Sequence, residues 1–527
     1  MNNEKENRIQ KINKMREIGI NPYPAKANRT HSCKELKDDF DKLESRNEQI
    51  VLAGRIRSIR IHGKSIFVDL EDEFGKIQIY VKKDEVDGNN KEWKRLNSVC
   101  SGTKINPFQF FKDFVDMGDF VEAEGSLFKT KKGEVTLLVK NFRILSKALI
   151  SIPVEHFGIK DEDEKLRKRY LDILCNPEVK EIFYKKAKFW NSVRQFLVDK
   201  GFLEVETPVL ENTTGGAEAR PFITHHNALD IDVYLRISMG ELWQKRLMSA
   251  GYEKTFEIGR QFRNEGMDAE HLQDYTQMEF YWAYADYAMG MDLVAEMFKY
   301  VAKETFGTLK FKVHGFNIDL GKKWEVYDYQ KTVKKYTGIN ILKTDLKKIE
   351  KKLKELKIDY DKKGFNITRG IDNLWKYCRK QIAGPGFLVN LPLIVSPLAK
   401  KQDDNQNVVQ RFQPIIAGSE LGNGYSELND PQDQSKRFME QAKLREEGDD
   451  EAQMDDKDFV EMLEYGMPPT TGFGISERVF SFLMDRPMRE CQIFPLMRPR
   501  IAPPINKGGI SLPACPPYWR AVLAGGG

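Results

Sequence analysis

The stretch FEIGRQFRNEG, from Phe256 to Gly266, alternates between apolar and polar residues as a half-buried β-strand does. A second alternating stretch, YTQMEFYWAY, begins at Tyr275 after the polar loop MDAEHLQD. Two such strands joined by a short loop predict an antiparallel hairpin. Alternate residues of a strand share a face, so one face would carry Arg263, Glu265, Tyr275, Glu279 and Tyr281. The common alternative is a hairpin whose polar face is merely solvated, and this segment alone does not exclude it.

A glycine-rich segment, IIAGSELGNGYSELND from Ile415 to Asp430, contains two further acidic residues. Glu420 and Glu427 are separated by an odd number of residues and would face opposite ways on a straight strand. If both serve one site, a bulge near Gly422 must shift the register. Taken alone, the segment favours the alternative of a hairpin turn at Asn423–Gly424.

A third segment, TGFGISERVFSFLMDRP, places two glycines before Arg478 and an apolar helix after it. An arginine in the first turn of a helix is disfavoured by the helix dipole, unless an anion binds there. The segment therefore indicates an anion-binding arginine, and a glycine-rich turn with a surface arginine is the alternative.

Composition narrows the class of protein. The chain has 527 residues, of which 40% are hydrophobic and 31% charged, which is typical of a globular protein. Its net charge of +5 is mild, so any contact with a polyanion would be a local patch. Six scattered cysteines form no CxxC pair, which argues against a zinc knuckle or a disulfide framework and favours a cytoplasmic location. No apolar run is long enough to predict a signal peptide or a membrane span.

The pattern changes along the chain in a way that predicts separate domains. From Ile50 onward, five short alternating runs over about a hundred residues predict a small closed β-barrel, most simply an OB-fold. The expected segments are a basic helical N-terminal extension (1–48), the barrel (49–147), a helical connector (148–180), a long catalytic domain (181–498) and a flexible Pro/Gly-rich tail (499–527).

Together the three segments resemble the signature motifs of class II aminoacyl-tRNA synthetases. The stretches ARPFITHHNALDIDVYLRI, RQFRNEG, YADY, VSPLAKK, GNGYSELNDPQDQ and EYGMPPTTGFG are similar to the lysyl-tRNA synthetase family. The resemblance covers roughly residues 8–498, and ITHHN, SPLAK and ELNDPxDQ separate it from the aspartyl and asparaginyl enzymes. It implies an α+β fold, in which an N-terminal OB-fold barrel for the anticodon precedes an antiparallel-sheet catalytic domain flanked by helices. It also implies a homodimer formed through the helix and strand that end at Pro208.

The resemblance further implies activation of L-lysine by ATP with Mg²⁺, followed by transfer of lysine to tRNA(Lys). Arg263 and Arg478 match the catalytic arginines. The implied ATP-binding residues are Arg263, Glu265, His271, Tyr275, Glu420 and Arg478, and Glu420 is the implied magnesium ligand. The implied lysine-binding residues are Gly216, Glu241, Glu279, Tyr281, Asn423, Tyr425 and Glu427. Arg60, Phe67 and Gln78 match anticodon-binding positions, although packing in the barrel core is the alternative for Phe67.

The sequence departs from the family pattern at four places. Gln413 stands where the family has a second magnesium-binding glutamate, and a neutral amide is a weaker magnesium ligand. Glu270 stands where the family has an arginine before His271, which weakens triphosphate contact from that loop. GFGISER is one residue shorter than the usual motif, and SMGEL is one residue longer. Two alternatives stay open: a relative that charges a different amino acid or modifies a protein lysine, and a non-catalytic tRNA-binding or regulatory paralogue.

Overall fold

The computed structural model describes residues 2–46, 49–86, 93–94, 105–152, 161–217, 219–264, 266, 268, 270–360, 365–393, 396, 398–446, 454 and 456–498. The chain divides into two compact units, Met1–Lys160 and Asp161–Gly527, and each is described here by itself. The Pro/Gly-rich tail expected over residues 499–527 lies outside the described residues.

The first unit is built on a closed five-stranded barrel with the strand order β1-β2-β3-β5-β4. Its strands are β1 (Ile50–His62), β2 (Ser65–Glu71), β3 (Lys76–Lys82), β4 (Phe120–Lys129) and β5 (Val135–Ser146). The pairs are antiparallel except for β3 and β5, which run parallel. Buried and half-buried residues alternate along β2, as expected for a strand with one face on a core. The predicted OB-fold barrel is confirmed.

Short helices complete the core of the barrel unit. They are α1 (Asn2–Glu17), α2 (Cys33–Asp38), α3 (Phe40–Arg46) and α5 (Pro107–Phe114). Met15, Leu36 and Phe40 are buried in the same apolar cluster as the barrel residues Val68 and Ile79. The described part of the segment expected as an extension, residues 2–46, therefore packs as part of the barrel unit.

The second unit is built on a nine-stranded sheet with the order β14-β15-β16-β18-β19-β11-β10-β6, in which β17 also pairs with β16. The strands are β6 (Leu203–Glu204), β10 (Lys254–Phe262), β11 (Asp274–Ala283), β14 (Glu325–Asp328), β15 (Gly386–Val389), β16 (Arg411–Ile416), β17 (Ser419–Glu420), β18 (Asn423–Ser426) and β19 (Thr470–Ser476). All pairs from β15 to β10 are antiparallel, and only the outermost pairs β14–β15 and β10–β6 are parallel. This confirms the antiparallel catalytic sheet.

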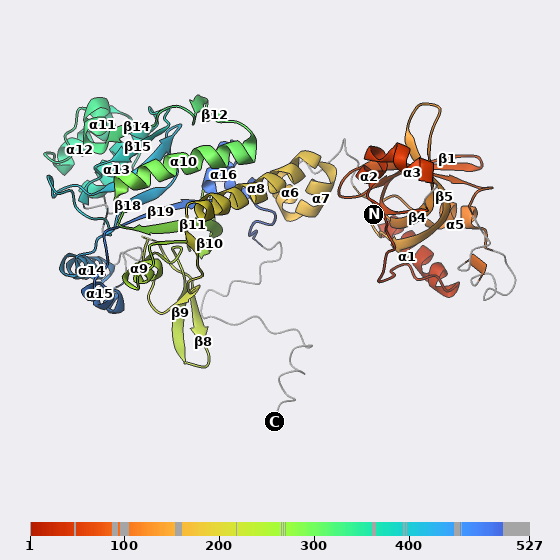
Figure 1. The fold of residues 1–527 in the computed structure, drawn as a ribbon, viewed down its shortest axis with the longest axis horizontal. Coiled ribbons are helices and arrows are strands. Elements are labelled where there is room, and N and C mark those ends of the chain that lie inside the picture. Colours follow the sequence, from red (N-terminus) through yellow and green to blue (C-terminus); the bar gives the residue numbers. More distant parts are fainter. Residues whose placement is uncertain are drawn as a thin grey trace. The chain divides into compact units, whose positions relative to one another are not determined.

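Helices cover both faces of this sheet (Figure 1). On one face, α8 (Pro177–Asp199) and α10 (Tyr287–Phe306) share an apolar cluster with Phe256, Phe280 and Phe473 of the sheet. Residues of the opposite face, among them Tyr281 and Tyr425, belong to a second cluster. Helices that contribute to it are α9 (Glu241–Ser249), α11 (Tyr329–Thr337), α12 (Leu346–Glu355), α13 (Ile367–Arg379), α14 (Pro431–Glu446) and α15 (Lys457–Glu464). The site described below lies on this second face.

Smaller elements surround the large sheet. A three-stranded sheet of β7 (Leu210–Glu211), β9 (Ile231–Leu235) and β8 (Ile223–His226) projects away from it (Figure 1). A two-stranded sheet pairs β12 (Lys310–Val313) with β13 (Phe316–Asp319). The remaining helices are α6 (Glu162–Arg167), α7 (Arg169–Cys175), α16 (Arg478–Leu483) and the 3-10 turn η3 (Met488–Cys491). Within the described residues, no helix has the length and apolar character needed to cross a bilayer.

Candidate active site

The predicted hairpin forms between β10 and β11, with Glu257 opposite Glu279 and Gln261 opposite Tyr275. Arg263 follows the last residue of β10, and its backbone N–H donates to Gln273 O at 2.8 Å, which extends the pairing into the loop. Its guanidinium lies 6.0 Å from the centre of the Tyr275 ring and donates to Ile237 O at 3.3 Å. Glu265, expected beside it, lies outside the described residues.

The glycine-rich segment is a broken strand, so the turn expected at Asn423–Gly424 is wrong. Both residues lie within β18, and the chain reverses instead at Ala417–Gly418, where φ is 44° and 72°. Glu420 pairs with Ile415 and Tyr425 pairs with Arg411, so four intervening residues on one strand face three on the other. The extra residue falls at Leu421–Gly422, where a bulge was required to bring Glu420 and Glu427 into one site.

Gly472 and Gly474 leave space above the middle of the sheet because they have no side chain. A Cβ on Gly472 would clash with the Glu427 Oε1 atom and would lie 2.6 Å from Tyr281 Cε1. A Cβ on Gly474 would lie 3.0 Å from Glu279 Cγ. Only a residue without a Cβ leaves room for these side chains above the strand.

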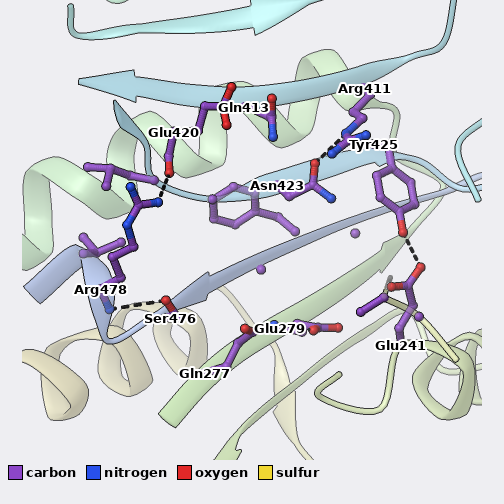
Figure 2. A pocket seen from close by; sticks show the side chains of 18 of the residues that line it. Glu241, Gln277, Glu279, Arg411, Gln413, Glu420, Asn423, Tyr425, Ser476 and Arg478 are labelled. Atoms are coloured by element: carbon purple, nitrogen blue, oxygen red, sulfur yellow. Dashed lines mark hydrogen bonds between the residues drawn. The ribbon is translucent and has the colours of Figure 1, made fainter. Parts of the chain in front are cut away.

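One cavity of about 430 Å³ on the second face collects the predicted residues. Of the described residues, those predicted for ATP, lysine or metal binding all line it: Gly216, Glu241, Arg263, His271, Tyr275, Glu279, Tyr281, Gln413, Glu420, Asn423, Tyr425, Glu427 and Arg478. Figure 2 shows Arg478 beside Glu420 at one end of the cavity and Tyr425 beside Glu241 at the other. We call the end that holds Arg263 and Arg478 the cationic end, and the end that holds Glu241, Glu279 and Glu427 the acidic end.

At the acidic end, Glu241, Glu279 and Glu427 are buried, with 2–6% of each residue exposed. Glu279 accepts hydrogen bonds from Gln277 Nε2 at 2.6 Å, Met239 N at 3.0 Å and Tyr281 Oη at 3.0 Å. Burial, followed by the charge of Glu241, raises the pKa of Glu279 to about 7. Burial also raises the pKa of Glu427 to about 8, although Lys245 opposes the shift. The acidic end thus holds carboxylates that lack a full complement of positive charge.

Lys245 of α9 is the internal cation of this end, and the sequence analysis missed it. Its Nζ lies 2.8 Å from Glu241 Oε1 and 2.5 Å from Glu427 Oε2, and only 1% of the residue is exposed. Burial alone would lower the pKa of Lys245, but the charges of Glu241 and Glu427 raise it overall. The i,i+4 spacing of Glu241 and Lys245 in SMGELWQKRL was the signal available in the sequence.

At the cationic end, Arg478 is the first residue of α16 and reaches across the cavity. Its Nη1 donates to Glu420 O at 2.8 Å, and its Nη2 lies 2.6 Å from Glu270 Oε2. Arg411 lines the cavity away from Arg478 and near Tyr425, with which it pairs across the strands (Figure 2). Its Nε donates to Asn423 Oδ1 at 2.7 Å and its Nη1 to Ser396 Oγ at 2.9 Å. Arg411 was missed, although it lies two residues before Gln413 on the same strand face.

The residues expected to bind magnesium form a sparse set. The Trp375 indole donates to Glu420 Oε1, and Arg379 Nη1 lies 3.7 Å from Glu420 Oε2. Gln413 lines the same cavity from β16. Among the described residues, no cluster of three or more His, Cys, Asp or Glu side chains is arranged to hold a metal ion. Mg²⁺ is commonly held by one or two carboxylates together with substrate phosphates, so this set fits an ion that arrives with a nucleotide.

Known proteins resemble the chain over nearly its whole length. A family described as "tRNA synthetases class II (D, K and N)" matches residues 161–498, and an "OB-fold nucleic acid binding domain" matches residues 50–145. Proteins named "Lysine--tRNA ligase" from Thermosipho africanus and Thermotoga maritima are 42% and 43% identical, over 94% of this chain and 96% of each relative. One from Thermoanaerobacter pseudethanolicus is 44% identical over 94% of this chain and 95% of its own. The chain belongs to the lysine--tRNA ligase family. This membership confirms the resemblance drawn from the motifs.

The three residues matched to anticodon contacts in this family lie on adjacent strands of the barrel. Arg60 pairs with Phe67, and Asp69 pairs with Gln78. Phe67 alternates with the core residues Ile66 and Val68, so its alternative assignment to the barrel core is wrong. Its ring instead stacks on the Tyr80 ring, with centroids 4.6 Å apart and planes 8° from parallel.

The two polar residues of this group differ in exposure. The Arg60 side chain is 44% exposed and pairs with Asp69 at 3.0 Å. Gln78 is only 8% exposed, and its Oε1 accepts from Thr136 Oγ1 at 3.2 Å. Arg60 and Phe67 are therefore more accessible to a ligand than Gln78.

The titration of Glu279 predicts a pH-dependent stability. Its ordinary pKa of 4.5 rises to about 7 in the folded chain, so between these values the folded form keeps a proton that the unfolded form releases. Stability should therefore fall as pH rises through this window, and Glu279→Gln should remove that part of the slope. We expect wild type to lose on the order of 3 kcal/mol relative to Glu279→Gln between pH 4.5 and pH 8.

Denaturant unfolding followed by tryptophan fluorescence measures this difference, because most tryptophans lie in the second unit. Glu304→Gln, an exposed change on α10, is the matched control and should leave the slope unchanged. Equal slopes for wild type and Glu279→Gln would contradict the burial of an unbalanced carboxylate.

Proposed function

We propose that the protein is a lysine--tRNA ligase that activates L-lysine with ATP and transfers it to tRNA(Lys). The observation that carries the proposal is the union, in one cavity, of a cationic end with Arg263 and Arg478 and an acidic end with Glu241, Glu279 and Glu427. The first end suits a nucleotide triphosphate, and the second suits an amino acid with a cationic side chain. Their arrangement is supported by membership of the family.

The cationic end can promote adenylate formation by charge and alignment. The lysine carboxylate must attack the α-phosphorus of ATP, and both groups are negative. Arg263 would neutralise the α-phosphate and the carboxylate, and Arg478 would bind the γ-phosphate. Tyr275, which lies under the Arg263 guanidinium, would stack on the adenine. Alignment of two bound reactants can supply about 7–11 kcal/mol of the barrier without a general base.

Mg²⁺ would enter with ATP and supply further charge neutralisation at the phosphates. Glu420 would hold it, with Gln413 as a weaker neutral partner. His271 also lines this end, with Nδ1 at 2.8 Å from Asp268 Oδ2, and would face the nucleotide. Glu265, which lies outside the described residues, is proposed from its match to the family alone.

The acidic end would select lysine. Glu241 would bind the α-ammonium group, while Glu279 and Glu427 would bind the ε-ammonium group with Tyr281 as a hydrogen-bonding partner. Gly216, Asn423 and Tyr425 would complete the walls around the substrate. A neutral side chain of similar length would leave these carboxylates buried and unpaired, which is strongly unfavourable.

The barrel would bind the anticodon through Arg60, Phe67 and Gln78. Phe67 offers a flat ring already stacked on Tyr80, which suits the stacking of a base. We also propose a homodimer. Large apolar residues are exposed on the strand after α8 and on the small sheet beyond it: Leu203, Val209, Leu210, Ile223 and Ile231. Charging of tRNA serves translation, so we propose a cytoplasmic location.

Amino-acid-dependent ATP–pyrophosphate exchange, run with each of the twenty amino acids, tests the proposal. Lysine should support exchange, and Glu279→Gln should lower kcat/KM for lysine by about 100-fold or more, because a buried ammonium then lacks its partner. The variant should remain folded by circular dichroism. Exchange with a different amino acid would identify a relative of altered specificity. Absence of exchange with all twenty would identify a non-catalytic paralogue.

The Arg478–Glu270 ion pair predicts an effect on ATP. Glu270 holds the guanidinium that a γ-phosphate needs, and its charge repels the triphosphate. Because the two side chains are 22% and 41% exposed, the pair is worth at most about 1 kcal/mol. Glu270→Gln should therefore lower KM for ATP about 2- to 5-fold and leave KM for lysine unchanged. Glu304→Gln is the control, and an increased KM for ATP in Glu270→Gln would show that Glu270 assists nucleotide binding.

Phe67→Ala tests the barrel. Loss of one base-stacking contact is typically worth about 1–3 kcal/mol, so KM for tRNA(Lys) in aminoacylation should rise about 5- to 100-fold. Phe120→Ala removes an exposed ring on β4 of the same barrel and should change it little. If both variants charge tRNA(Lys) as wild type does, the assignment of Phe67 to the anticodon is incorrect.

A further inference from the structure

Lys245 lies behind the acidic end of the cavity. Among the described residues it is absent from those that line the cavity, whereas Glu241 and Glu427 do line it. Its ammonium group contacts Glu241 Oε1 and Glu427 Oε2, at 2.8 and 2.5 Å. The aromatic rings of Tyr281, Tyr425 and Phe459 surround it, with centres 5.5–6.0 Å from Nζ. The group is thus fixed on all sides.

The other oxygen of each carboxylate points to the substrate side. A Cβ built on Gly216 would lie 3.1 Å from Glu241 Oε2, and one built on Gly472 would fall on Glu427 Oε1. Both glycines line the cavity. Lys245 therefore holds the rear oxygens of the two carboxylates and leaves the front oxygens available. Since Glu241 and Glu427 come from different parts of the chain, a single ammonium group fixes their relative orientation.

The charges at this end follow a simple count. Three carboxylates, those of Glu241, Glu279 and Glu427, face one built-in ammonium group, and full ionisation leaves two negative charges uncompensated. A lysine molecule carries two ammonium groups, one at the α-carbon and one at the end of the side chain. Without Lys245, full ionisation would leave three uncompensated charges, so the carboxyl groups would keep their protons to a higher pH than they do beside Lys245.

We propose that Lys245 is a specificity-determining positioning residue, which orients Glu241 and Glu427 and leaves the fully ionised pocket with two negative charges that balance the two ammonium groups of the amino acid. This inference rests on the proposed function. The titratable groups that face one another around Lys245 are Glu241 from α9, Glu279 and Tyr281 from β11, Tyr425 from β18 and Glu427 after it. Both tyrosines are buried, which raises their pKa well above the usual value and leaves them neutral in the working range.

Lys245→Met tests the proposal, because it removes the charge and keeps an unbranched side chain. Calorimetric titration with L-lysine between pH 6 and pH 9.5 is the measurement. Loss of the ammonium group makes a carboxyl group retain its proton to higher pH, and that proton must leave before lysine binds. We expect the dissociation constant for lysine to rise at least 10-fold at pH 7. The pH below which affinity declines should move upward by about one unit or more, while affinity for ATP stays unchanged.

The double variant Lys245→Met/Glu427→Gln is the matched comparison and guards against a misfolded single variant. It removes both members of one ion pair and restores the count of two uncompensated charges. Its affinity for lysine should exceed that of Glu427→Gln alone, and its pH midpoint should return to that of wild type or below. A purely structural Lys245 would weaken binding without moving the midpoint, and that result would overturn the inference.

Failure of the proposed function and failure of the role of Lys245 give different results. If the wild-type protein binds no lysine at any pH, the proposed function fails. If wild type binds lysine and Lys245→Met leaves the pH midpoint in place, only the role of Lys245 fails. A double variant that shows the same upward shift as Lys245→Met would also overturn the inference.

Discussion

The catalytic unit depends on one constraint, which is that several carboxylates are buried close to one another. Glu241, Glu279 and Glu427 are each nearly inaccessible to water, and all three line the same cavity. Such a group is tolerated only where hydrogen bonds and a counter-charge offset its desolvation. Met239 N, Gln277 and Tyr281 supply the hydrogen bonds to Glu279, and Lys245 supplies the charge. The negative charge that remains unbalanced is the reason why we propose a cationic ligand for this end of the cavity.

The sheet makes this arrangement possible because it separates two kinds of surface. Alternation along β11 sends Phe280 toward α8 and α10, and sends Glu279 and Tyr281 toward the cavity. The same strand runs from Tyr275, near Arg263, to Tyr281 at the acidic end. Arg263 and Glu279 therefore lie near different parts of the same strand, and the separation between the two ends of the cavity is set by backbone geometry.

Local patterns predicted the strands well and the contacts across the fold poorly. The period of two in FEIGRQF and YTQMEFYWA was enough to predict the hairpin and its polar face, because one side of it is buried. The turn at Asn423–Gly424 was mispredicted because an Asn-Gly pair favours a hairpin turn locally, whereas strand pairing with β19 holds both residues extended. Lys245 was missed although Glu241 lies four residues before it, because its second partner, Glu427, lies far away in the chain. The contacts of Arg411 with Ser396 and Asn423 depend on how the intervening loops fold. Glu270 was noted as a departure, but its pairing with Arg478 depends on tertiary structure.

The extra residue between Glu420 and Tyr425 limits how the sequence of this segment can evolve. Single substitutions in this segment leave the strand register unchanged, whereas an insertion or deletion shifts it. Loss or gain of one residue at Leu421–Gly422 would turn either Glu420 or Tyr425 to the wrong side of the sheet. The fixed length of this segment therefore links the cationic end of the cavity to the acidic end. The two ends of the cavity are therefore expected to evolve together.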